Sequence, residues 1–489
     1  MSSVSGDIAA AVRLLQSALP DNVVTPETVA EYESEKTRPW SQSCWTSAAA
    51  FIRPQDSAGV AEVLKIITKT KTKFALRTHG HTPNPGFNGT GNAGVVIDLQ
   101  NLSSMSLDVT KTVLDVGAGA NWSEVYKFLE KNELSAIGGR DAVVVILRFP
   151  IFMDLALMAS KALRYSFPYS ESLTPKAIWL DFRKVVLADS SIVTADADNN
   201  PNLFKALKGG GSNFETATSV KLHVHPLIKI QYTLNLYAES DFANIIKATV
   251  KTQEAMKDDF RANLFTNFHN GFVVSGLLYG GTPEEQPEAF KSFADRSSQI
   301  NTLVPKTNGT ILSLATAMAH EIKLMKRTIG TVTTKVSYDL YFEVYKMWKE
   351  VIGELPAGID SHYTIHPVSA SAVEAGERRG GNAMGLQKDS QCCNQTLIGW
   401  VFTAEWPDDE HDQAARQAVS KLVRTVQSLA VGSGHSLEYL WMNFADSTQD
   451  VLSSYGSANL QSLRDVAAQY DPEGVFQSLQ NDGFLLRKI

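Results

Sequence analysis

Residues 74–88 read FALRTHGHTPNPGFN, a short apolar run followed at once by a loop rich in glycine and proline. The run has the composition of a buried strand, and Gly80, Gly86 and two prolines then favour a tight turn. A loop of this kind can direct backbone N–H groups at a phosphate. Because it also carries His81 beside Gly80, it is the first candidate for a binding loop.

The composition is that of a globular protein. The chain has 489 residues, of which 44% are hydrophobic and 20% are charged, and this length is too great for one core. We therefore expect two large or two interleaved domains. The formal net charge of −7 comes without a long block of Lys or Arg, which argues against nucleic acid or an anionic membrane as partner. The expected partners are small molecules, and the composition leaves the oligomeric state open.

Cysteine and histidine spacings predict neither a disulfide framework nor a metal site. The three cysteines are Cys44 and the adjacent pair Cys392 and Cys393, with no Cys-x-x-Cys spacing. His320 precedes a glutamate but lacks the second histidine of a zinc-binding helix. Reduced, structural thiols are the expected state.

The N-terminal residues predict a helix rather than a signal peptide. They have no basic start, and Ile8, Val12, Leu15 and Leu19 recur at helical spacing, so we expect a cytoplasmic protein. The most apolar run, 143–159, is interrupted by charged residues and a proline and is short for a bilayer crossing. No membrane partner is expected.

The first half of the chain alternates strands with helices, which indicates an α+β or α/β domain. Asp56 can cap a helix with apolar residues at i, i+3, i+4 and i+7, and Asn121 opens a helix to about residue 131. The segment from Asn200 to Gly209 predicts a short helix. Strands are predicted at 51–54, 74–77, 94–99, 112–116, 184–188, 191–195 and 221–225.

The pattern changes after Pro226. Strands at 230–237 and 272–278 mix with a helix at 241–256, which predicts an antiparallel sheet covered by helices. A further helix is predicted near residues 460–469. We therefore divide the chain into an N-terminal helical segment, 1–44, a first domain, 45–227, a second domain, 228–434, and a C-terminal segment, 435–489.

Four separated segments carry a resemblance to one known family. They are 74–88, 113–122, 185–214 and 443–476. The third is the best match, because VLADSSIVT at 186–194 and the run NPNLFKALKGGG that follows lie almost in register with a family signature. The chain resembles the berberine-bridge-enzyme-like FAD-linked oxidoreductases of the vanillyl-alcohol oxidase superfamily, whose FAD-binding domain is of the PCMH type.

The resemblance implies an α+β fold in which a PCMH-type domain of two α/β subdomains joins a substrate domain with an antiparallel sheet covered by helices. By this resemblance, residues 45–227 bind FAD and the C-terminal segment 435–489 returns to that domain. His81 would be the residue bonded covalently to the flavin, although a histidine in such a loop is more often structural. The other residues implied at the cofactor are Arg77, Thr78, His79, Gly80, Thr82, Gly86, Asn88, Gly117, Gly119, Gly139 and Asn443.

Two glycine motifs also have simpler explanations. Gly117 and Gly119 lack the third glycine and the downstream acidic residue of a Rossmann fingerprint, so we expect them at a strand end that approaches the flavin. The run 209–211 is explained equally well as the end of a helix.

The implied reaction is oxidation of an alcohol, an amine or an activated C–H bond of a small, fairly apolar metabolite, as in secondary metabolism. A base would remove a proton, a hydride would pass to flavin N5, and dioxygen would reoxidise the flavin. Tyr439 and Tyr363 are weak candidates for the base, since most tyrosines in such positions are core residues. A dehydrogenase that avoids dioxygen is the other form of this chemistry.

The resemblance fails in one segment. The family places a glycine-rich run after residues 138–140, but no glycine occurs here from 140 to 208, and 142–182 departs from the family. The missing glycines are explained either by true divergence from the family or by a fault in the deduced reading frame. Glu215 replaces a family glycine, and a glutamate near bound phosphates would repel them. No cysteine lies between residues 44 and 392, so any covalent attachment should use His81 alone.

These departures support one alternative of a different class. A family member that has lost glycines from its cofactor site could be catalytically impaired, hold no FAD, and act by binding a metabolite or a partner. Retention of Gly80, His81 and Gly86 argues against that alternative.

Overall fold

A computed structural model of the chain describes residues 8–136, 138–139, 180–259, 261–294, 296–319, 323–368, 381–386 and 397–489. The segment 142–182, which we expected to depart from the family, lies outside these residues as far as 179, and so do Cys392 and Cys393. Among the helices of the described ranges, none has both the length and the apolar character needed to cross a bilayer.

A four-stranded sheet begins the fold. Its order is β1-β2-β4-β3, with β2, β4 and β3 parallel and β1 antiparallel. Helices α1 and α3 pack against it, and the Asp56 side chain accepts the N–H of Gly59 at 2.8 Å, which confirms the predicted cap. The elements are β1 (Val23–Val24), β2 (Ala48–Ile52), β3 (Lys73–Arg77), β4 (Gly91–Asp98), α1 (Ile8–Ala18), α2 (Val29–Lys36) and α3 (Ser57–Thr70).

A second, five-stranded antiparallel sheet follows in the order β5-β6-β10-β8-β9. The predicted strand at 221–225 was too short, because β10 starts at Glu215 and pairs with β6 and β8 on its two sides. Asn121 caps α4 in a capping box with Glu124, as predicted. The elements are β5 (Met105–Leu107), β6 (Val113–Gly117), β8 (Leu180–Leu187), β9 (Ile192–Ala195), β10 (Glu215–His223), α4 (Trp122–Lys131) and α6 (Pro201–Leu207), with β7 (Leu134–Ser135) paired to β11 (His225–Pro226).

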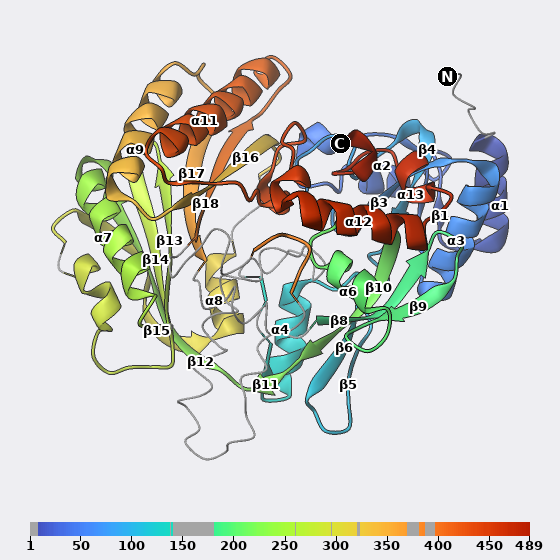
Figure 1. The fold of residues 1–489 in the computed structure, drawn as a ribbon, viewed down its shortest axis with the longest axis horizontal. Coiled ribbons are helices and arrows are strands. Elements are labelled where there is room, and N and C mark those ends of the chain that lie inside the picture. The colour runs from blue at the N-terminus through green and yellow to red at the C-terminus, as the bar shows by residue number, and fades with distance from the viewer. Residues whose placement is uncertain are drawn as a thin grey trace.

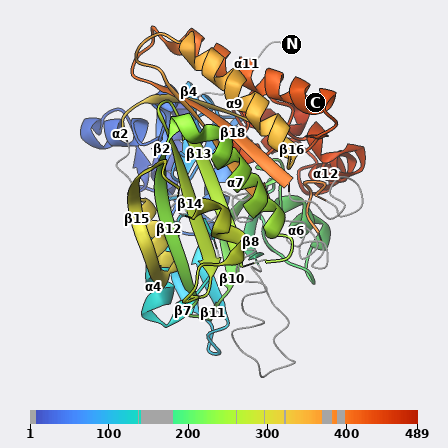
Figure 2. The same ribbon diagram turned by 90° about the vertical axis from the view of Figure 1, so that its left-hand side faces the viewer.

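The third sheet has eight antiparallel strands in the order β15-β12-β14-β13-β17-β18-β16-β19, and α7, α9 and α11 lie along one face (Figures 1 and 2). This confirms the predicted antiparallel sheet covered by helices. The strands are β12 (Lys229–Ala238), β13 (Ala262–His269), β14 (Phe272–Gly280), β15 (Gln299–Thr310), β16 (Lys326–Lys335), β17 (Asp360–Val368), β18 (Leu397–Trp406) and β19 (Ser436–Leu437). The helices are α7 (Phe242–Ala255), α8 (Ile311–Met318), α9 (Tyr338–Gly353) and α11 (Asp412–Gly432).

The C-terminal residues form α12 (Ser457–Tyr470), which packs against α6, and α13 (Val475–Ser478), which packs on the first sheet (Figure 1). The N–H of Phe74 in β3 donates to the carbonyl of Leu479 at 3.0 Å, and the N–H of Asn481 donates back to Phe74 at 2.6 Å. The rings of Phe74 and Phe476 meet edge to face at 5.8 Å. The tail therefore lies beside the strand that leads into the loop at 78–88. Short 3-10 helices complete the described elements at Gln42–Cys44, Glu239–Asp241, Glu288–Phe293, Met442–Phe444, Ser453–Tyr455 and Leu486–Lys488.

A buried ion cluster fixes the end of β3. The side chain of Arg77 is 1% exposed, and its guanidinium pairs with Glu35 in α2 and with Asp98 in β4. The same guanidinium donates to the backbone carbonyl of Glu35 at 2.7 Å. Because buried charges are costly unless they are paired and hydrogen-bonded, these contacts hold α2, β3 and β4 in one arrangement.

Replacing Arg77 by methionine should lower the free energy of unfolding by about 3 kcal/mol, because the buried Asp98 carboxylate would lose its closest guanidinium partner and Glu35 would lose one of its three. Chemical denaturation followed by tryptophan fluorescence measures this loss. The matched control is Lys65→Met, which removes an exposed ion pair with Glu62 and should cost less than about 1 kcal/mol. Equal stability of the two variants would contradict the cluster's role.

Candidate functional site

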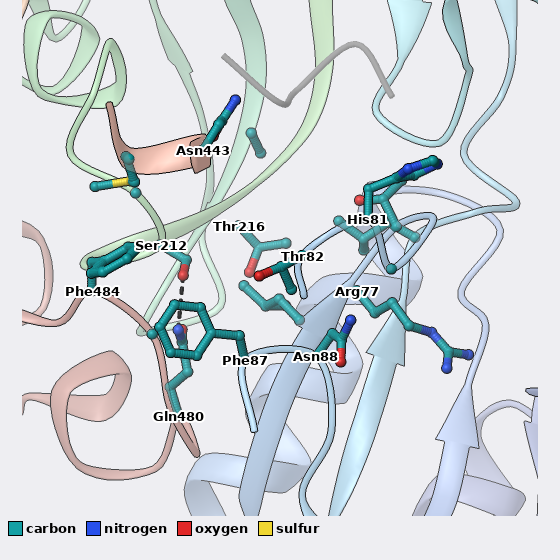
Figure 3. Close-up of a pocket in the computed structure, with 18 of the residues that line it drawn as sticks. Arg77, His81, Thr82, Phe87, Asn88, Ser212, Thr216, Asn443, Gln480 and Phe484 are labelled. Atoms are coloured by element: carbon teal, nitrogen blue, oxygen red, sulfur yellow. Dashed lines mark hydrogen bonds between the residues drawn. The ribbon is translucent and has the colours of Figure 1, made fainter. Parts of the chain in front are cut away.

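A cavity of about 340 Å³ lies where the loop at 78–88, the segment at 207–217 and the C-terminal tail meet (Figure 3). We call it the His81 cavity. Its volume falls within the range of about 300–1,000 Å³ that is typical of small-molecule sites. Its lining residues are Leu76, Arg77, Thr78, His79, Gly80, His81, Thr82, Phe87, Asn88, Leu99, Leu207, Gly209, Gly211, Ser212, Glu215, Thr216, Ala217, Met442, Asn443, Gln480, Asp482, Gly483 and Phe484.

Glycine and the tail together hold the loop in shape. Gly80 has a φ of +68°, and a Cβ built there would lie 3.0 Å from the Cα of Pro39. The carbonyl of Gly80 accepts the N–H of Trp40 at 3.1 Å. Farther along, the side chain of Asn84 donates to Ala445 at 2.9 Å and accepts the N–H of Ser447 at 3.0 Å. The sharp turn beside His81 is thus held at both ends.

Two histidines of the loop reach the cavity. The rings of His79 and His81 have their centroids 6.5 Å apart, and both residues are half-buried. Burial lowers the pKa of His79, while Asp98 acts in the opposite sense. The Nδ1 atom of His79 is buried and has no hydrogen-bond partner among the described residues. Figure 3 shows His81 on one side of the cavity and Asn443 on the other.

The wall of the His81 cavity contains several buried polar atoms that pair with nothing in the described parts of the chain. Both polar atoms of Asn88 are of this kind, and Gln480 uses only its Nε2, which donates to Ser212 at 2.8 Å (Figure 3). The unpaired atoms are His79 Nδ1, Asn88 Oδ1 and Nδ2, Glu215 Oε2, Thr216 Oγ1 and Gln480 Oε1. Each such group costs about 1–3 kcal/mol when it is left unpaired, so their convergence on one cavity fits a bound polar molecule.

These residues fit the chemistry of FAD. Amide and hydroxyl groups, such as those of Asn88 and Thr216, can bond a ribityl chain, a pyrophosphate or the polar edge of an isoalloxazine ring. Apolar side chains of Leu76, Leu99 and Met442 provide surface for the flat ring system. The loop at 78–88 offers the backbone turn that we expected near a phosphate.

Glu215 lies in the cavity wall at the start of β10. It is 5% exposed, and burial raises the pKa of its carboxyl to about 8. The other titratable residues that line the cavity are Arg77, His79, His81 and Asp482. At pH 7 the Glu215 carboxyl is therefore mostly protonated. The repulsion that we expected between this residue and a phosphate is weakened, and the neutral acid can donate a hydrogen bond.

The structure brings together most of the residues expected at a cofactor. Those that line the cavity are Arg77, Thr78, His79, Gly80, His81, Thr82, Asn88 and Asn443. Gly86 belongs to the same loop, has a φ of +86° and faces Asp482. Arg77 lines the cavity, but its guanidinium points into the buried ion cluster and not toward a ligand.

Besides Gly86, three expected glycines do not line the His81 cavity. A Cβ on Gly117 would lie 1.9 Å from the carbonyl oxygen of Leu102, and one on Gly119 would lie 2.3 Å from that of Leu99. A Cβ on Gly139 would lie 2.9 Å from the indole ring of Trp122. In the described structure, close contact with neighbouring backbone accounts for Gly117 and Gly119, and close contact with the Trp122 ring accounts for Gly139.

Neither tyrosine proposed as a base reaches the cavity. Tyr363 is fully buried on the helix-covered side of the large sheet, where its ring stacks on Phe268 at 4.7 Å. Tyr439 is buried too, and its hydroxyl contacts the sulfur of Met384 at 3.3 Å. Burial raises the pKa of both phenols. No contact in the described structure supports either tyrosine as the base, which must touch the substrate.

Several lining residues were not predicted from the sequence. Ser212 and Thr216 follow the glycine run at 209–211, which we explained as the end of a helix. Gln480 and Phe484 lie just beyond the matched part of the tail. The Asn-Asp-Gly at 481–483 is a turn signal that marks this segment, but no local pattern places it beside His81.

Residues 48–141 match a protein family described as FAD binding domain. An FAD-dependent monooxygenase of Arthrobotrys oligospora is 30% identical to this chain over 449 residues, which cover 91% of this chain and 84% of that protein. An FAD-dependent monooxygenase of Aspergillus niger is 29% identical over 94% of this chain and 76% of its own length.

Solved structures share the fold at low sequence identity. Xylooligosaccharide oxidase from Myceliophthora thermophila has a TM-score of 0.75 at 16% identity, with 97% of this chain and 99% of that chain covered. Glucooligosaccharide oxidase from Acremonium strictum, which carries a 6-S-cysteinyl, 8α-N1-histidyl FAD, has a TM-score of 0.72 at 15% identity over 96% and 99% of the two chains. These likenesses establish the arrangement of the three sheets.

The raised pKa of Glu215 predicts a pH-dependent stability. The pKa of its carboxyl is about 8 in the folded protein, against a reference value of 4.5. The stability that the protonated carboxyl contributes to the folded state is therefore fully present below about pH 4.5 and is lost as the pH rises to 8. Glu215→Gln should gain stability relative to the wild type by up to about 1.4 kcal/mol per pH unit over that window.

Urea denaturation of both proteins from pH 5 to 9 gives this difference. Glu285→Gln, which changes an exposed carboxylate, should give a difference that does not vary with pH. If the difference in stability between Glu215→Gln and the wild type also did not vary with pH, Glu215 would be ionised in the folded protein.

Proposed function

This chain belongs to the FAD-linked oxidoreductases related to berberine bridge enzyme, and we propose that it oxidises a small, fairly apolar metabolite with dioxygen as the electron acceptor. FAD is its cofactor, and it is an FAD-dependent oxidoreductase. The bond oxidised belongs to an alcohol, an amine or an activated C–H group.

One observation supports the His81 cavity as the flavin site. Asn88, Thr216 and Gln480 line it, and each has a buried polar atom without a partner in the described chain. An apolar ligand would leave these atoms unpaired, whereas FAD carries hydrogen-bonding groups along its whole length. The same atoms argue against the alternative of a family member that holds no FAD.

We propose that His81 attaches FAD covalently. His81 lines the cavity next to Gly80, whose positive φ fixes the direction of the loop. The Acremonium strictum oxidase, which shares the fold, carries a histidyl linkage together with a cysteinyl one. This chain has no cysteine between residues 44 and 392, so a single linkage is proposed. His79 is the competing residue, since its ring also reaches the cavity.

When bound, FAD supplies the two-electron chemistry, by accepting a hydride from the substrate and passing electrons to dioxygen. The chain's own residues bind and orient the reactants. Asn88 and Thr216 offer hydrogen bonds, and the protonated Glu215 carboxyl can donate one more. Leu76, Leu99 and Met442 exclude water from the apolar part of the cavity.

The relatives named above support a role in secondary metabolism. They are fungal FAD-dependent monooxygenases that match this chain over most of its length. Monooxygenation and simple oxidation share the reaction of reduced flavin with dioxygen, and they differ in whether an oxygen atom enters the product. A substrate of modest size and low polarity also suits a protein without a long block of charge.

His81→Ala should abolish covalent attachment of FAD. The purified wild-type protein should be yellow and should keep its colour in the pellet after acid precipitation, whereas the variant should release at least about nine tenths of its flavin, because no bond remains. His79→Ala is the control and should keep its flavin in the pellet.

If the His81→Ala variant kept its flavin in the pellet, the covalent bond to FAD would have to be formed by another residue. A wild-type protein that stays colourless after incubation with FAD would instead support the family member that binds no cofactor.

Dioxygen as acceptor has a test that needs no substrate. The protein is reduced anaerobically with dithionite and mixed with air-saturated buffer, and the flavin absorbance near its visible maximum is followed. We expect complete reoxidation at least about tenfold faster than that of free reduced FAD, because an oxidase site favours charge transfer to dioxygen. A flavin that stays reduced in air but is reoxidised by an artificial dye would identify a dehydrogenase.

A further inference from the structure

Two histidines that lie far apart in the sequence meet on the large sheet. His269 is the last residue of β13, and His362 lies near the start of β17. These strands are antiparallel, and the pair Phe268 and Tyr363 is the last one in register before the two histidines. Their rings stack with centroids 4.7 Å apart. The histidines are therefore cross-strand neighbours.

Asp360 completes the group. It precedes His362 by two residues in β17, so both side chains project from the same face of the sheet. One ligand atom from each of His269, Asp360 and His362 lies within 4.8 Å of the others. We call these three residues the His269 cluster. Two imidazoles and one carboxylate are a common ligand set for divalent transition metals.

One ring nitrogen of the cluster has no partner in the described protein. A neutral imidazole offers a nitrogen lone pair to a metal ion. The Nδ1 atom of His362 is buried and meets no hydrogen-bond partner in the described part of the chain. A bound cation would supply the partner that one of these rings lacks.

The charges around the cluster also favour a cation. Asp360 pairs across the sheet with Glu405 of β18, which brings a second carboxylate close. Arg327 binds Glu405 from β16, so one positive charge balances one of the two carboxylates. The Asp360 carboxylate thus stays available as a ligand.

The cluster lies on the face of the sheet that the helices leave uncovered. Phe268 and Tyr363 pack on Trp348 of α9, so the residues that alternate with them, His269 and His362, point the other way. His366 lies on that same face, about 13 Å along β17 at 3.3 Å per residue. Its ring stacks on Phe444 at 5.5 Å, beside the cavity residue Asn443.

We propose that His269, Asp360 and His362 bind one divalent transition-metal ion of the zinc class, with the remaining coordination positions filled by water. The ion joins β13 to β17 on the face of the sheet that looks toward the FAD domain. The site is separate from the His81 cavity and does not depend on the proposed oxidation.

The test is zinc binding to the full-length protein, purified without a histidine tag and stripped with a chelator. Competition with a chromophoric zinc indicator should give one site per chain, and cobalt should give visible d–d absorption bands. Zinc should also raise the melting temperature. His362→Gln should weaken this binding by at least about 100-fold, since loss of a residue that only supports a ligand already costs about 10–100-fold.

A second variant, Asp360→Asn, separates loss of metal binding from misfolding, because Asp360 is exposed and the variant should fold normally. We expect it to weaken zinc binding by more than about tenfold and to change the cobalt spectrum. His435→Gln, which removes an imidazole outside the cluster, should bind zinc as the wild type does. Equal binding by the wild type, Asp360→Asn and His362→Gln, or no binding by the wild type, would overturn the proposal.

Discussion

The buried guanidinium of Arg77 is the contact on which the site's geometry depends. It pairs with Glu35 and Asp98, and all three side chains are at most 2% exposed. Such a cluster is stable only when every charge keeps its partner, so it fixes where β3 ends. The loop that carries His81 starts at the next residue. A residue that the family resemblance implied at the cofactor therefore acts on the cavity mainly by positioning that loop.

The C-terminal tail is the second constraint. It hydrogen-bonds to β3 at Phe74, and its residues Gln480 and Phe484 form part of the cavity wall. The cavity thus needs segments that are about 400 residues apart in the chain to be in place together. For this reason we expect flavin binding and the packing of the tail to be energetically coupled.

Burial shifts the pKa of a carboxyl group and the pKa values of two imidazole groups in opposite directions. Glu215 is a carboxylate by composition, yet removal from water keeps it neutral near pH 7. Burial lowers the pKa values of His269 and His362 instead, and so favours their neutral form. For Glu215 the residue type alone suggests a charge that the folded protein does not carry.

Local patterns in the sequence determined much of the fold. They placed the caps at Asp56 and Asn121, the helix-covered antiparallel sheet and the loop with His81, because such features depend on residues close in the chain. The motifs shared with the family identified the cofactor as FAD. Only the tertiary structure decided that Tyr363 lies in a core, that Gln480 lines the cavity and that His269 meets His362. These outcomes depend on strand register and on long-range packing, and no pattern local to one segment encodes either of them.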